Sequence, residues 1–378
     1  MRRFLLILVS GGLLQISLSA KVSEADFAFI HINRSNSDIS YERVNEVFQD
    51  SRGLLWVGTA KGLNRFDGYS FTVYDKDALG VPSDCIYCIA EDSAGNVWTG
   101  TDRGVSVYDY RNDRFVPFRT VSDKGTVIDN KVNNILCDGD RIYLTVNHQG
   151  LFSYDLKSGC LINYFVKDGA ETLPQGIRRL AIGSGGDFWL ALYFNDLYRC
   201  PAGLDSLESV SLWGVDFRKD NIEGIVQSKE NSHIIYAVST KNGLCRIDTK
   251  LRRTTHLLNL PAGAVKGLLL EPGRCLWIPT VCGLWRYDLL DGSHIVLKSD
   301  AGNRFSLSDD CANSVLIDNA GRLWVGTKDG GLNCSDHEMR NFIRHDSCGG
   351  HSLENSMVSG FADDGAGTMW VTTEKGEI

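Results

Sequence analysis

The order of apolar and polar positions along the chain predicts short strands joined by tight turns. In the clearest stretch, β-branched and apolar residues cover 44–49 and are followed by the turn letters D-S-R-G. Three more apolar runs cover 55–59, 63–66 and 70–74, with Gly or Asp-Gly between them. Asp, Ser and Gly are typical of turns because they hydrogen-bond locally or accept positive φ. The stretch therefore predicts four short antiparallel strands.

The same pattern recurs along the chain. It returns clearly over 86–109 and 314–336, and in weaker form between them. One aromatic residue marks the second strand of each copy, and the marks are Trp56, Trp98, Tyr143, Trp189, Tyr236, Trp277, Trp324 and Trp370. Successive marks lie 41 to 47 residues apart. Four strands in about 45 residues is the size of one propeller blade, so the chain predicts seven complete blades and an eighth that is cut off.

These repeats favour an all-β fold, a β-propeller of four-stranded antiparallel blades. One sheet has two faces to cover, and stacking against a neighbour on each side covers both. The aromatic marks would fill the layers between blades, and Gly58, Gly100 and Gly326 would lie where neighbouring chains crowd together. The segment 27–32 resembles a fourth strand, so we expect it to complete the last blade and close a seven-bladed ring. The eighth repeat would then open a second propeller; eight blades in one ring is the alternative.

The N-terminus changes this picture by adding an export signal. A positive start at Arg2 and Arg3 precedes a largely apolar run that ends in small residues at 17–20, as in a secretory signal peptide. An uncleaved membrane anchor is the alternative. The predicted organisation is a signal peptide over 1–20, a propeller over 21–345 and an incomplete eighth repeat over 346–378.

Charge and cysteine content narrow the function. The formal net charge is −8, which argues against general nucleic-acid binding because no basic excess is available for phosphates. Eleven cysteines are present, and the C-x-x-C spacing of Cys85 and Cys88 lacks both a thioredoxin-like context and a nearby His for zinc. Most cysteines, such as Cys245, lie in apolar strands and act as small hydrophobic residues. We expect no cofactor and no metal.

The repeats resemble the two-component regulator propeller repeat, whose consensus runs I-x-x-D-x-x-G-x-L-W-x-G-T-x-x-G-L-x-x-F/Y-D. The resemblance covers about residues 27–378 and is strongest over 44–67, 86–109 and 314–336. In the middle blades other residues replace the Gly-Thr pair, so those copies are assigned by their spacing more than by sequence identity. The repeat is characteristic of the periplasmic sensor region of hybrid two-component systems in Bacteroidetes.

This resemblance implies a much longer protein, with two seven-bladed propellers, an immunoglobulin-like domain, one membrane helix, a histidine kinase, a receiver and a DNA-binding module. The chain stops at Ile378, inside repeat eight, so it is expected to be a truncated product or partial gene. The resemblance implies a periplasmic sensor that detects oligosaccharides from polysaccharide breakdown. The full-length protein would be an inner-membrane homodimer anchored by the missing downstream helix, and its kinase is absent from this chain.

Candidate ligand contacts lie in the turns between second and third strands, which open on one face of a propeller. Five of them could pair with anionic groups and two could stack on sugar rings, and the set is Lys61, Arg103, His148, Lys241, Lys328, Tyr193 and Phe194. The ligand would then be an acidic oligosaccharide. The alternative is that these are ordinary solvated turn residues.

Catalysis has little support in the sequence. The chain has no G-x-S-x-G elbow, no H-E-x-x-H and no Walker-type phosphate loop. Two other hypotheses stay open: a standalone exported propeller that binds other proteins, and a propeller lyase or hydrolase. Two close carboxylates with a perturbed pKa in one pocket would favour the last of these.

Overall fold

The computed structural model describes residues 7–9, 12–14, 22–76, 80–164, 176–183, 185–193, 196–201, 207–261, 267–271, 274–335, 357–363 and 369–373. The chain divides into two compact units, residues 1–336 and 337–378. The expected boundary at 345/346 and most of the predicted signal peptide lie outside the described residues. Within residues 1–20, β1 (Ile7–Val9) pairs antiparallel with β2 (Gly12–Leu14).

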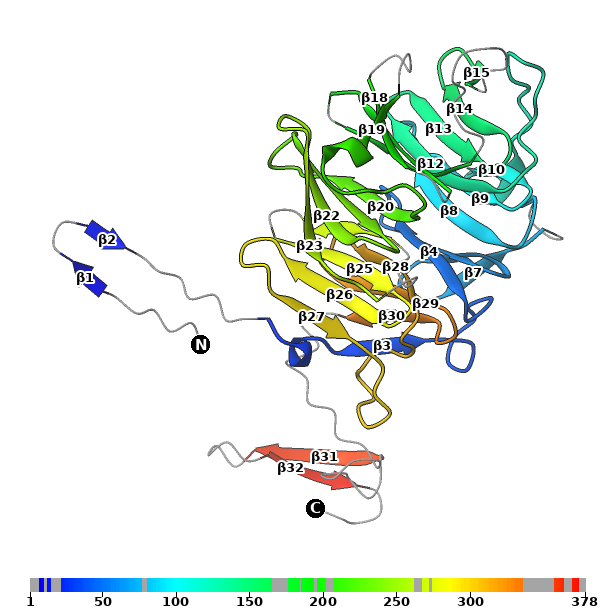
Figure 1. The fold of residues 1–378 in the computed structure, drawn as a ribbon. Helices are drawn as coiled ribbons and strands as arrows, with labels where there is room; N and C mark the ends of the chain where they lie inside the picture. The colour runs from blue at the N-terminus through cyan, green and yellow to red at the C-terminus, as the bar shows by residue number, and fades with distance from the viewer. Residues whose placement is uncertain are drawn as a thin grey trace. The chain divides into compact units, whose positions relative to one another are not determined.

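The larger unit contains seven four-stranded antiparallel sheets arranged as a β-propeller (Figure 1). The inner strands are β4 (Val44–Gln49), β8 (Ile86–Glu91), β12 (Val132–Asp138), β16 (Ile177–Ile182), β20 (Ile222–Gln227), β24 (Leu269–Glu271) and β28 (Ala312–Ile317). The second strands are β5 (Leu55–Thr59), β9 (Val97–Thr101), β13 (Arg141–Val146), β17 (Phe188–Leu192), β21 (Ile234–Ser239), β25 (Cys275–Thr280) and β29 (Leu323–Thr327). The third strands are β6 (Gly62–Phe66), β10 (Gly104–Asp109), β14 (Gly150–Asp155), β18 (Leu197–Cys200), β22 (Gly243–Asp248), β26 (Gly283–Asp288) and β30 (Leu332–Ser335). The outer strands are β7 (Phe71–Tyr74), β11 (Arg114–Pro117), β15 (Leu161–Asn163), β19 (Glu208–Ser209), β23 (Arg253–Leu258), β27 (His294–Leu297) and β3 (Phe29–Ile32).

The ring is closed by the N-terminal strand β3. It pairs antiparallel with β30, with Phe29 opposite Ser335 and Ile32 opposite Leu332. Each inner strand contacts the inner strand of the next blade, and β28 contacts β4. The predicted closure of a seven-bladed ring by the segment 27–32 is therefore confirmed. Two short 3₁₀ helices, η1 (Glu24–Asp26) and η2 (Val210–Trp213), complete the described secondary structure.

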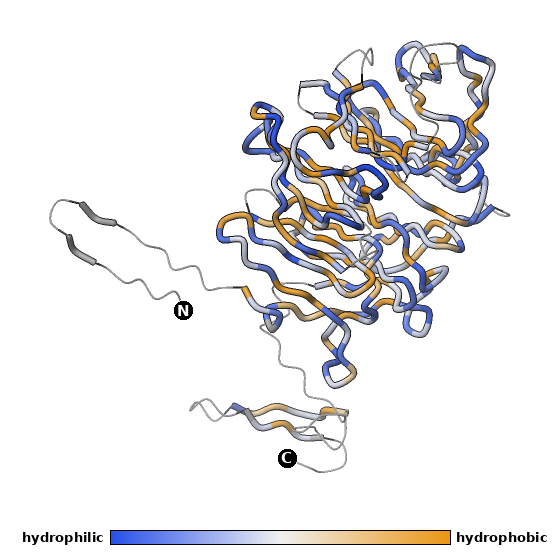
Figure 2. Tube along the Cα trace, in the orientation of Figure 1, coloured by the Kyte–Doolittle hydropathy of each residue, from blue (hydrophilic) through white to orange (hydrophobic). Residues whose placement is uncertain are grey.

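The core is a series of layers between neighbouring blades. Within the described residues there are seven buried apolar clusters, and each joins side chains from two adjacent blades. The cluster between blades seven and one contains Trp324 and Val57, so the last layer closes the circle. Hydrophobic residues follow the strands and hydrophilic ones the connecting turns (Figure 2). Stacking of blades thus covers both faces of each sheet, as the repeat pattern predicts.

The aromatic marks of the seven complete repeats are all buried in second strands, between 0 and 8% exposed. In three blades the indole N–H donates to the aspartate of the preceding turn: Trp56 to Asp50, Trp98 to Asp92 and Trp324 to Asp318, each at 2.8 Å. The predicted crowding at the glycines is also found. A Cβ on Gly100 would lie 2.5 Å from the Cys88 sulfur and 2.9 Å from Val132 of the next blade.

The smaller unit contains the strands of the eighth repeat. β31 (Val358–Asp363) and β32 (Met369–Thr373) pair antiparallel, with the same register shift near the start of the first strand as in the ring. Trp370, the eighth aromatic mark, is 51% exposed and Phe361 is 71% exposed. These side chains correspond to positions that are buried where a blade is complete.

Two further features concern possible membrane spans and the state of the cysteines. Within the parts of the chain that the structure describes, no helix has the length and apolar character needed to cross a membrane. The ten described cysteines are free thiols, and several of them, including Cys245, are buried in strands as expected.

Candidate functional site

A β-bulge near the start of the inner strands builds the candidate site. In six blades the pairing of the inner with the second strand skips one residue. The skipped residues are Asn45, Tyr87, Asn133, Arg178, Glu223 and Asn313. The equivalent position of blade six lies outside the described residues. A bulge bends its strand and re-aims a side chain, and all six of these residues line one pocket.

We call this cavity the mouth pocket, because it lies where the inner strands begin, at one end of the propeller channel. Its volume is about 230 Å³, and its other lining residues are Glu46, Lys131, Arg179 and Tyr193. A second cavity of about 370 Å³ continues between the inner strands and shares six lining residues with the mouth pocket: Glu46, Tyr87, Asn133, Arg179, Glu223 and Asn313. The pocket thus gathers charged, amide and phenol groups from six blades.

The three bulged asparagines hold neighbouring inner strands together. Each side-chain amide donates to the backbone oxygen of the first residue of the next inner strand: Asn45 to Ile86 at 2.8 Å, Asn133 to Ile177 at 3.0 Å and Asn313 to Val44 at 3.0 Å. Each contact gives a backbone oxygen of one inner strand a donor from the neighbouring blade. They give the mouth pocket a rigid wall.

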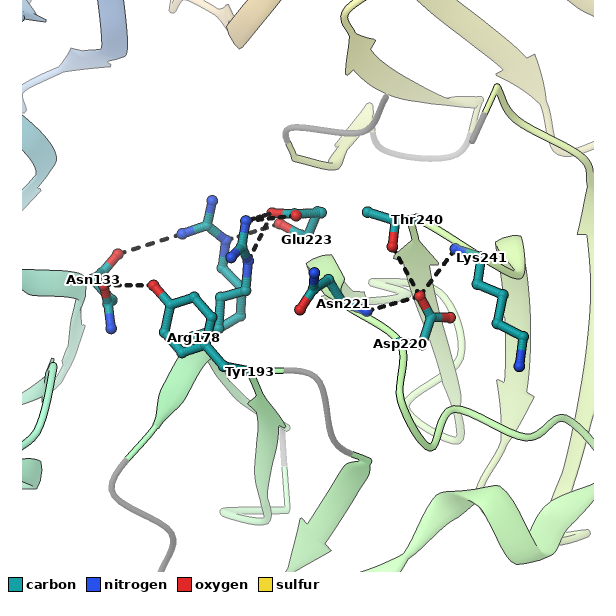
Figure 3. Close-up of polar contacts among 9 residues, drawn as sticks. Asn133, Arg178, Tyr193, Asp220, Asn221, Glu223, Thr240 and Lys241 are labelled. Carbon is teal, nitrogen blue, oxygen red and sulfur yellow. Dashed lines mark hydrogen bonds and ion pairs between the residues drawn. The ribbon is translucent and has the colours of Figure 1, made fainter. Parts of the chain in front are cut away.

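An arginine and a glutamate from adjacent blades form the most extensive contact in the pocket (Figure 3). Arg178 Nη2 lies 2.6 Å from Glu223 Oε1, and Arg178 Nε lies 3.0 Å from Glu223 Oε2. The Glu223 side chain is only 5% exposed, and this two-pronged geometry is the strong form of an ion pair. Arg179 donates to the backbone oxygens of Glu223 at 2.8 Å and Asn133 at 3.4 Å, so it links blades three, four and five.

Two tyrosines in the pocket each have a cation over one ring face. Lys131 Nζ lies 3.9 Å from the centre of the Tyr87 ring, and the Arg178 guanidinium carbon lies 4.9 Å from the centre of Tyr193. The Tyr193 hydroxyl also donates to Asn133 Oδ1 at 3.1 Å. These cation–π contacts hold positive charge at the pocket surface. They also occupy ring faces that a sugar could otherwise stack on.

The pocket perturbs its own ionisable groups. Burial raises the pKa of Glu46 to about 7, although the positive charge of Arg179 opposes the rise. Burial also lowers the pKa of Lys131, and the nearby charge of Arg178 lowers it further. The pocket holds two carboxylates, Glu46 and Glu223, and three cations, Lys131, Arg178 and Arg179. Such perturbed groups in a cavity are typical of functional sites.

Of the seven sequence-predicted contacts, Tyr193 lines the mouth pocket and Phe194 lies outside the described residues. The other five are exposed in turns between second and third strands and do not line it: Lys61, Arg103, His148, Lys241 and Lys328. These turns lie at the same end of the blades as the pocket, since Thr59, next to the Lys61 turn, pairs with Val44 at the start of β4. Some already have neighbours, as Lys328 lies 3.5 Å from Asp329.

The Lys241 turn is ordered by a buried acid beside the pocket (Figure 3). Asp220 Oδ1 accepts hydrogen bonds from Thr240 Oγ1 at 3.0 Å and from the Lys241 backbone N–H at 2.9 Å. Asp220 is 2% exposed, so it acts on the turn rather than on solvent. The Lys241 side chain itself is exposed.

The bulged residues were not predicted from the sequence, although a signal for them exists. They directly follow the first β-branched or small residue of each repeat, as Asn45 follows Val44 and Arg178 follows Ile177. Three of them are Asn and the others are Tyr, Arg and Glu, while the residue before each of them is Val, Ile or Ala. A search for regular alternation of apolar and polar residues misses them, because a bulge shifts the alternation of side chains between the two faces by one residue.

Chemically, the arrangement fits an anion with hydroxyl groups around it. Lys131 and Arg179 supply positive charge, and the asparagine and tyrosine side chains supply neutral donors and acceptors. Among the described residues, no three His, Cys, Asp or Glu side chains are grouped closely enough to hold a metal ion.

Two segments of the chain, residues 80–103 and 306–329, match the family described as the two component regulator propeller. These segments contain β8–β9 and β28–β29, with the Asp92 and Asp318 turns between the strands. In these two segments the chain is similar to two-component regulator propeller repeats. They build the inner halves of blades two and seven, and the bulged residues Tyr87 and Asn313 lie inside them.

Solved structures share this fold at low sequence identity. The extracellular domain of a candidate hybrid two-component system from B. thetaiotaomicron is similar with a TM-score of 0.72 and 20% identity, over 92% of this chain and 47% of that one. Virginiamycin B lyase from Staphylococcus aureus has a TM-score of 0.58 and 13% identity, over 82% of this chain and 99% of that one. The fold therefore occurs both in the extracellular domain of a two-component system and in a lyase.

A curated relative matches a shorter stretch. Histidine kinase P4 of Formosa agariphila is 37% identical over 59 residues, which are 16% of this chain and 4% of the kinase. The chain thus spans about half the length of the solved extracellular domain and a small part of the kinase.

Proposed function

We propose that this chain is the ligand-binding part of an exported sensor and that the mouth pocket binds an oligosaccharide released from an acidic polysaccharide. The observation that carries this proposal is the convergence of Lys131, Arg178 and Arg179 with two tyrosines and three asparagines in one pocket. Cations there meet the charge of an acidic sugar, and the amides and phenols meet its hydroxyls. The two-component regulator propeller repeats and the similarity to an extracellular receptor domain support a role in sensing.

The rest of the proposal concerns the full-length protein. Residues 1–20 direct export to the periplasm, and a helix downstream of this chain anchors the protein in the inner membrane. The protein acts as a homodimer whose two arrangements bind the ligand with different affinity, because a ligand shifts an equilibrium only by that difference. A histidine kinase on the other side of the membrane reads the shift. The 346–378 segment begins a second propeller.

The test measures whether the exported chain, residues 21–378, binds any of a panel of acidic oligosaccharides and whether it binds their carboxyl-reduced counterparts. We expect calorimetry to detect binding of an acidic fragment. Lys131→Met removes one charge with little change in shape, and Tyr193→Ala opens the pocket wall. Each should weaken binding about tenfold or more, since a hydrogen bond to a charged group contributes roughly 1.5–3 kcal/mol.

Lys241→Ala is the matched control, because this lysine is an exposed turn residue beside the pocket but does not line it. Binding of short fragments should be unchanged by Lys241→Ala. Equal weakening by Lys241→Ala and Lys131→Met would move the site to the turns. Failure of every oligosaccharide to bind the wild-type chain would remove the ligand class from the proposal.

Glycoside cleavage is a second candidate function, favoured by the two carboxylates that share the pocket. Glu46, with a pKa of about 7, resembles a general acid. Both oxygens of Glu223, however, accept hydrogen bonds from Arg178, which makes this carboxylate a weak base or nucleophile. We therefore propose binding without turnover. Chromatography of the ligand after prolonged incubation should recover it intact, whereas products that disappear with Glu46→Gln would establish an enzyme.

A further inference from the structure

The mouth pocket opens into the second cavity, which we call the inner cavity, and the two differ in character. They share six lining residues, one from each of six blades. Every described residue that lines the mouth pocket is polar or charged. Among the described residues that line the inner cavity alone, none is charged, and the polar side chains are those of Asn134 and Ser314. The channel therefore changes from polar to apolar from the mouth inward.

The apolar lining of the inner cavity comes from all seven blades. It extends almost to the far ends of the inner strands, at Phe48 on β4, Leu136 on β12 and Leu316 on β28. Ile225 and Val315 pack against core clusters between blades, but both remain partly exposed. Because these two residues also line the inner cavity, part of their apolar surface faces it.

Water is a poor occupant of such a cavity. An ordered internal water molecule needs roughly two to four polar partners, and this lining offers few. An apolar group that displaces poorly ordered water is bound favourably, in proportion to the apolar area that leaves solvent. An apolar cavity of about 150 Å³ holds a benzene molecule, so the inner cavity of about 370 Å³ has room for a short hydrocarbon chain.

We propose that the inner cavity is a subsite for a short acyl group carried by an acidic sugar whose polar part occupies the mouth pocket. This inference rests on the proposed function and specifies a further group on its ligand. The carboxylate and hydroxyl groups of the sugar contact the charged, amide and phenol groups of the mouth pocket, and the acyl chain contacts Ile225, Val315 and their apolar neighbours. One ligand occupies both cavities because they are continuous at the six shared residues.

The first experiment compares two pairs of probes that differ in the length of an alkyl chain: methyl with hexyl β-D-glucuronide, and acetate with hexanoate. Calorimetry measures their binding to the chain of residues 21–378. Hexyl glucuronide should bind at least about tenfold more tightly than methyl glucuronide, because each methylene group that enters the inner cavity strengthens binding by up to about fourfold. Hexanoate should bind more tightly than acetate for the same reason.

Gly267→Leu tests whether the chain lies in the inner cavity, because Gly267 is part of its wall. Beyond its chain neighbours, the one described residue within 4 Å of a Cβ on Gly267 would be Pro279, at an ordinary contact distance of 3.7 Å. The new side chain should therefore be tolerated and should remove most of the affinity ratio between hexyl and methyl glucuronide. Gly185→Leu makes the same change in an exposed turn, with no described atom within 4 Å of the new Cβ, so it is the matched control and should keep the wild-type ratio.

Two further measurements apply if Gly267→Leu does not fold. Val315→Thr places a hydroxyl group in the same wall at nearly the same volume, and it should lower the affinity ratio between hexyl and methyl glucuronide. In the wild-type complex, methyl NMR should detect contacts between the hexyl chain and the methyl groups of Ile225 and Val315.

Equal binding of the short and long probes in both pairs, or binding of none of them, would overturn the inference. The proposed function would still stand if the panel of acidic oligosaccharides binds. A preference for the hexyl chain that survives both Gly267→Leu and Val315→Thr would place the chain elsewhere and would also overturn the inference. Failure of the whole oligosaccharide panel would instead overturn the proposed function.

Discussion

An aspartate in the first turn of a blade and the tryptophan six residues later hold the clearest repeats together. In blade seven, Asp318 Oδ1 accepts the backbone N–H groups of Ala320 and Arg322 at 3.0 and 2.9 Å, and Oδ2 accepts the Trp324 indole. Oδ2 also accepts from Arg322 Nε at 2.7 Å. One buried carboxylate thus satisfies four donors, which would otherwise lose hydrogen bonds on folding. In blade six, Glu271 takes the place of this aspartate and accepts a hydrogen bond from the Trp277 indole at 3.0 Å.

Asp318→Ala should lower the free energy of unfolding by about 3 kcal/mol, because it leaves buried donors without an acceptor. Urea unfolding measures this change. Asp67→Ala is the matched control: Asp67 accepts two turn N–H groups at 2.8 Å, but it is exposed, so water replaces it. We expect the control to lose much less stability than Asp318→Ala. Equal losses in both variants would show that the Asp318–Trp324 contact contributes little.

The stability that Asp318 contributes should depend on pH. Burial alone would raise the pKa of Asp318, but hydrogen bonds from Trp324 and Arg322 and the charge of Arg322 bring it below its ordinary value. A lowered pKa in the folded state stabilises the fold above the unfolded pKa of about 3.9, and this contribution is lost as pH falls further. The difference in the free energy of unfolding between wild type and Asp318→Ala should therefore become smaller below about pH 4.

At the scale of elements, β3 decides whether the ring is closed. Phe29 is 2% exposed in the layer between blades six and seven, and Phe27 packs edge-on against Trp277 at 5.5 Å. His31 Nε2 contacts the Ser306 backbone oxygen at 2.7 Å. The contacts of Phe27 and His31 join residues 250 and 275 positions apart in the chain, so they form only when its two ends meet.

Deletion of residues 22–32 should lower the free energy of unfolding by at least about 4 kcal/mol, because it exposes a buried Phe and the edge of β30. Thermal unfolding followed by circular dichroism tests this. Deletion of 22–26 removes η1 and leaves β3, so it is the control and should have little effect. A ring that unfolds at the wild-type temperature without β3 would contradict closure by this strand.

At the scale of the whole molecule, the ring and the last segment are separate compact units. In the second unit Phe361 and Trp370 are largely exposed, whereas the matching residues of blade one, Val47 and Trp56, are buried. The exposed pair lies on strands with no third strand beside them among the described residues. Apolar strand edges of this kind favour association between chains.

Removal of residues 337–378 should leave the unfolding temperature of the ring unchanged, since its seven core layers lie within residues 1–336. The shortened chain should also stay monomeric at concentrations where the longer chain associates. Calorimetry and light scattering measure the two effects. A lower unfolding temperature in the shortened chain would show that the second unit stabilises the ring.

The sequence by itself determined the blades. Turn residues and apolar runs are local signals, so β4 and β5 begin and end at the residues that the pattern predicts. The even spacing of the aromatic marks indicated one blade for each repeat, because each mark fills one layer between neighbours, and it left rings of seven and of eight blades open. The similarity of the segment 27–32 to an outer strand was sufficient to predict ring closure.

The tertiary structure alone decided the site. Asn45, Tyr87, Asn133, Arg178 and Glu223 are 42 to 46 residues apart in sequence, and a closed ring brings them to one mouth. A bulge directs each of them into that mouth, and their place after the first β-branched or small residue of a repeat becomes a signal only once the bulge is known. The sequence found Tyr193 because it lies in a turn, where exposed side chains can be recognised. The charged groups of the pocket were missed because their environment depends on contacts between blades, which form only on folding.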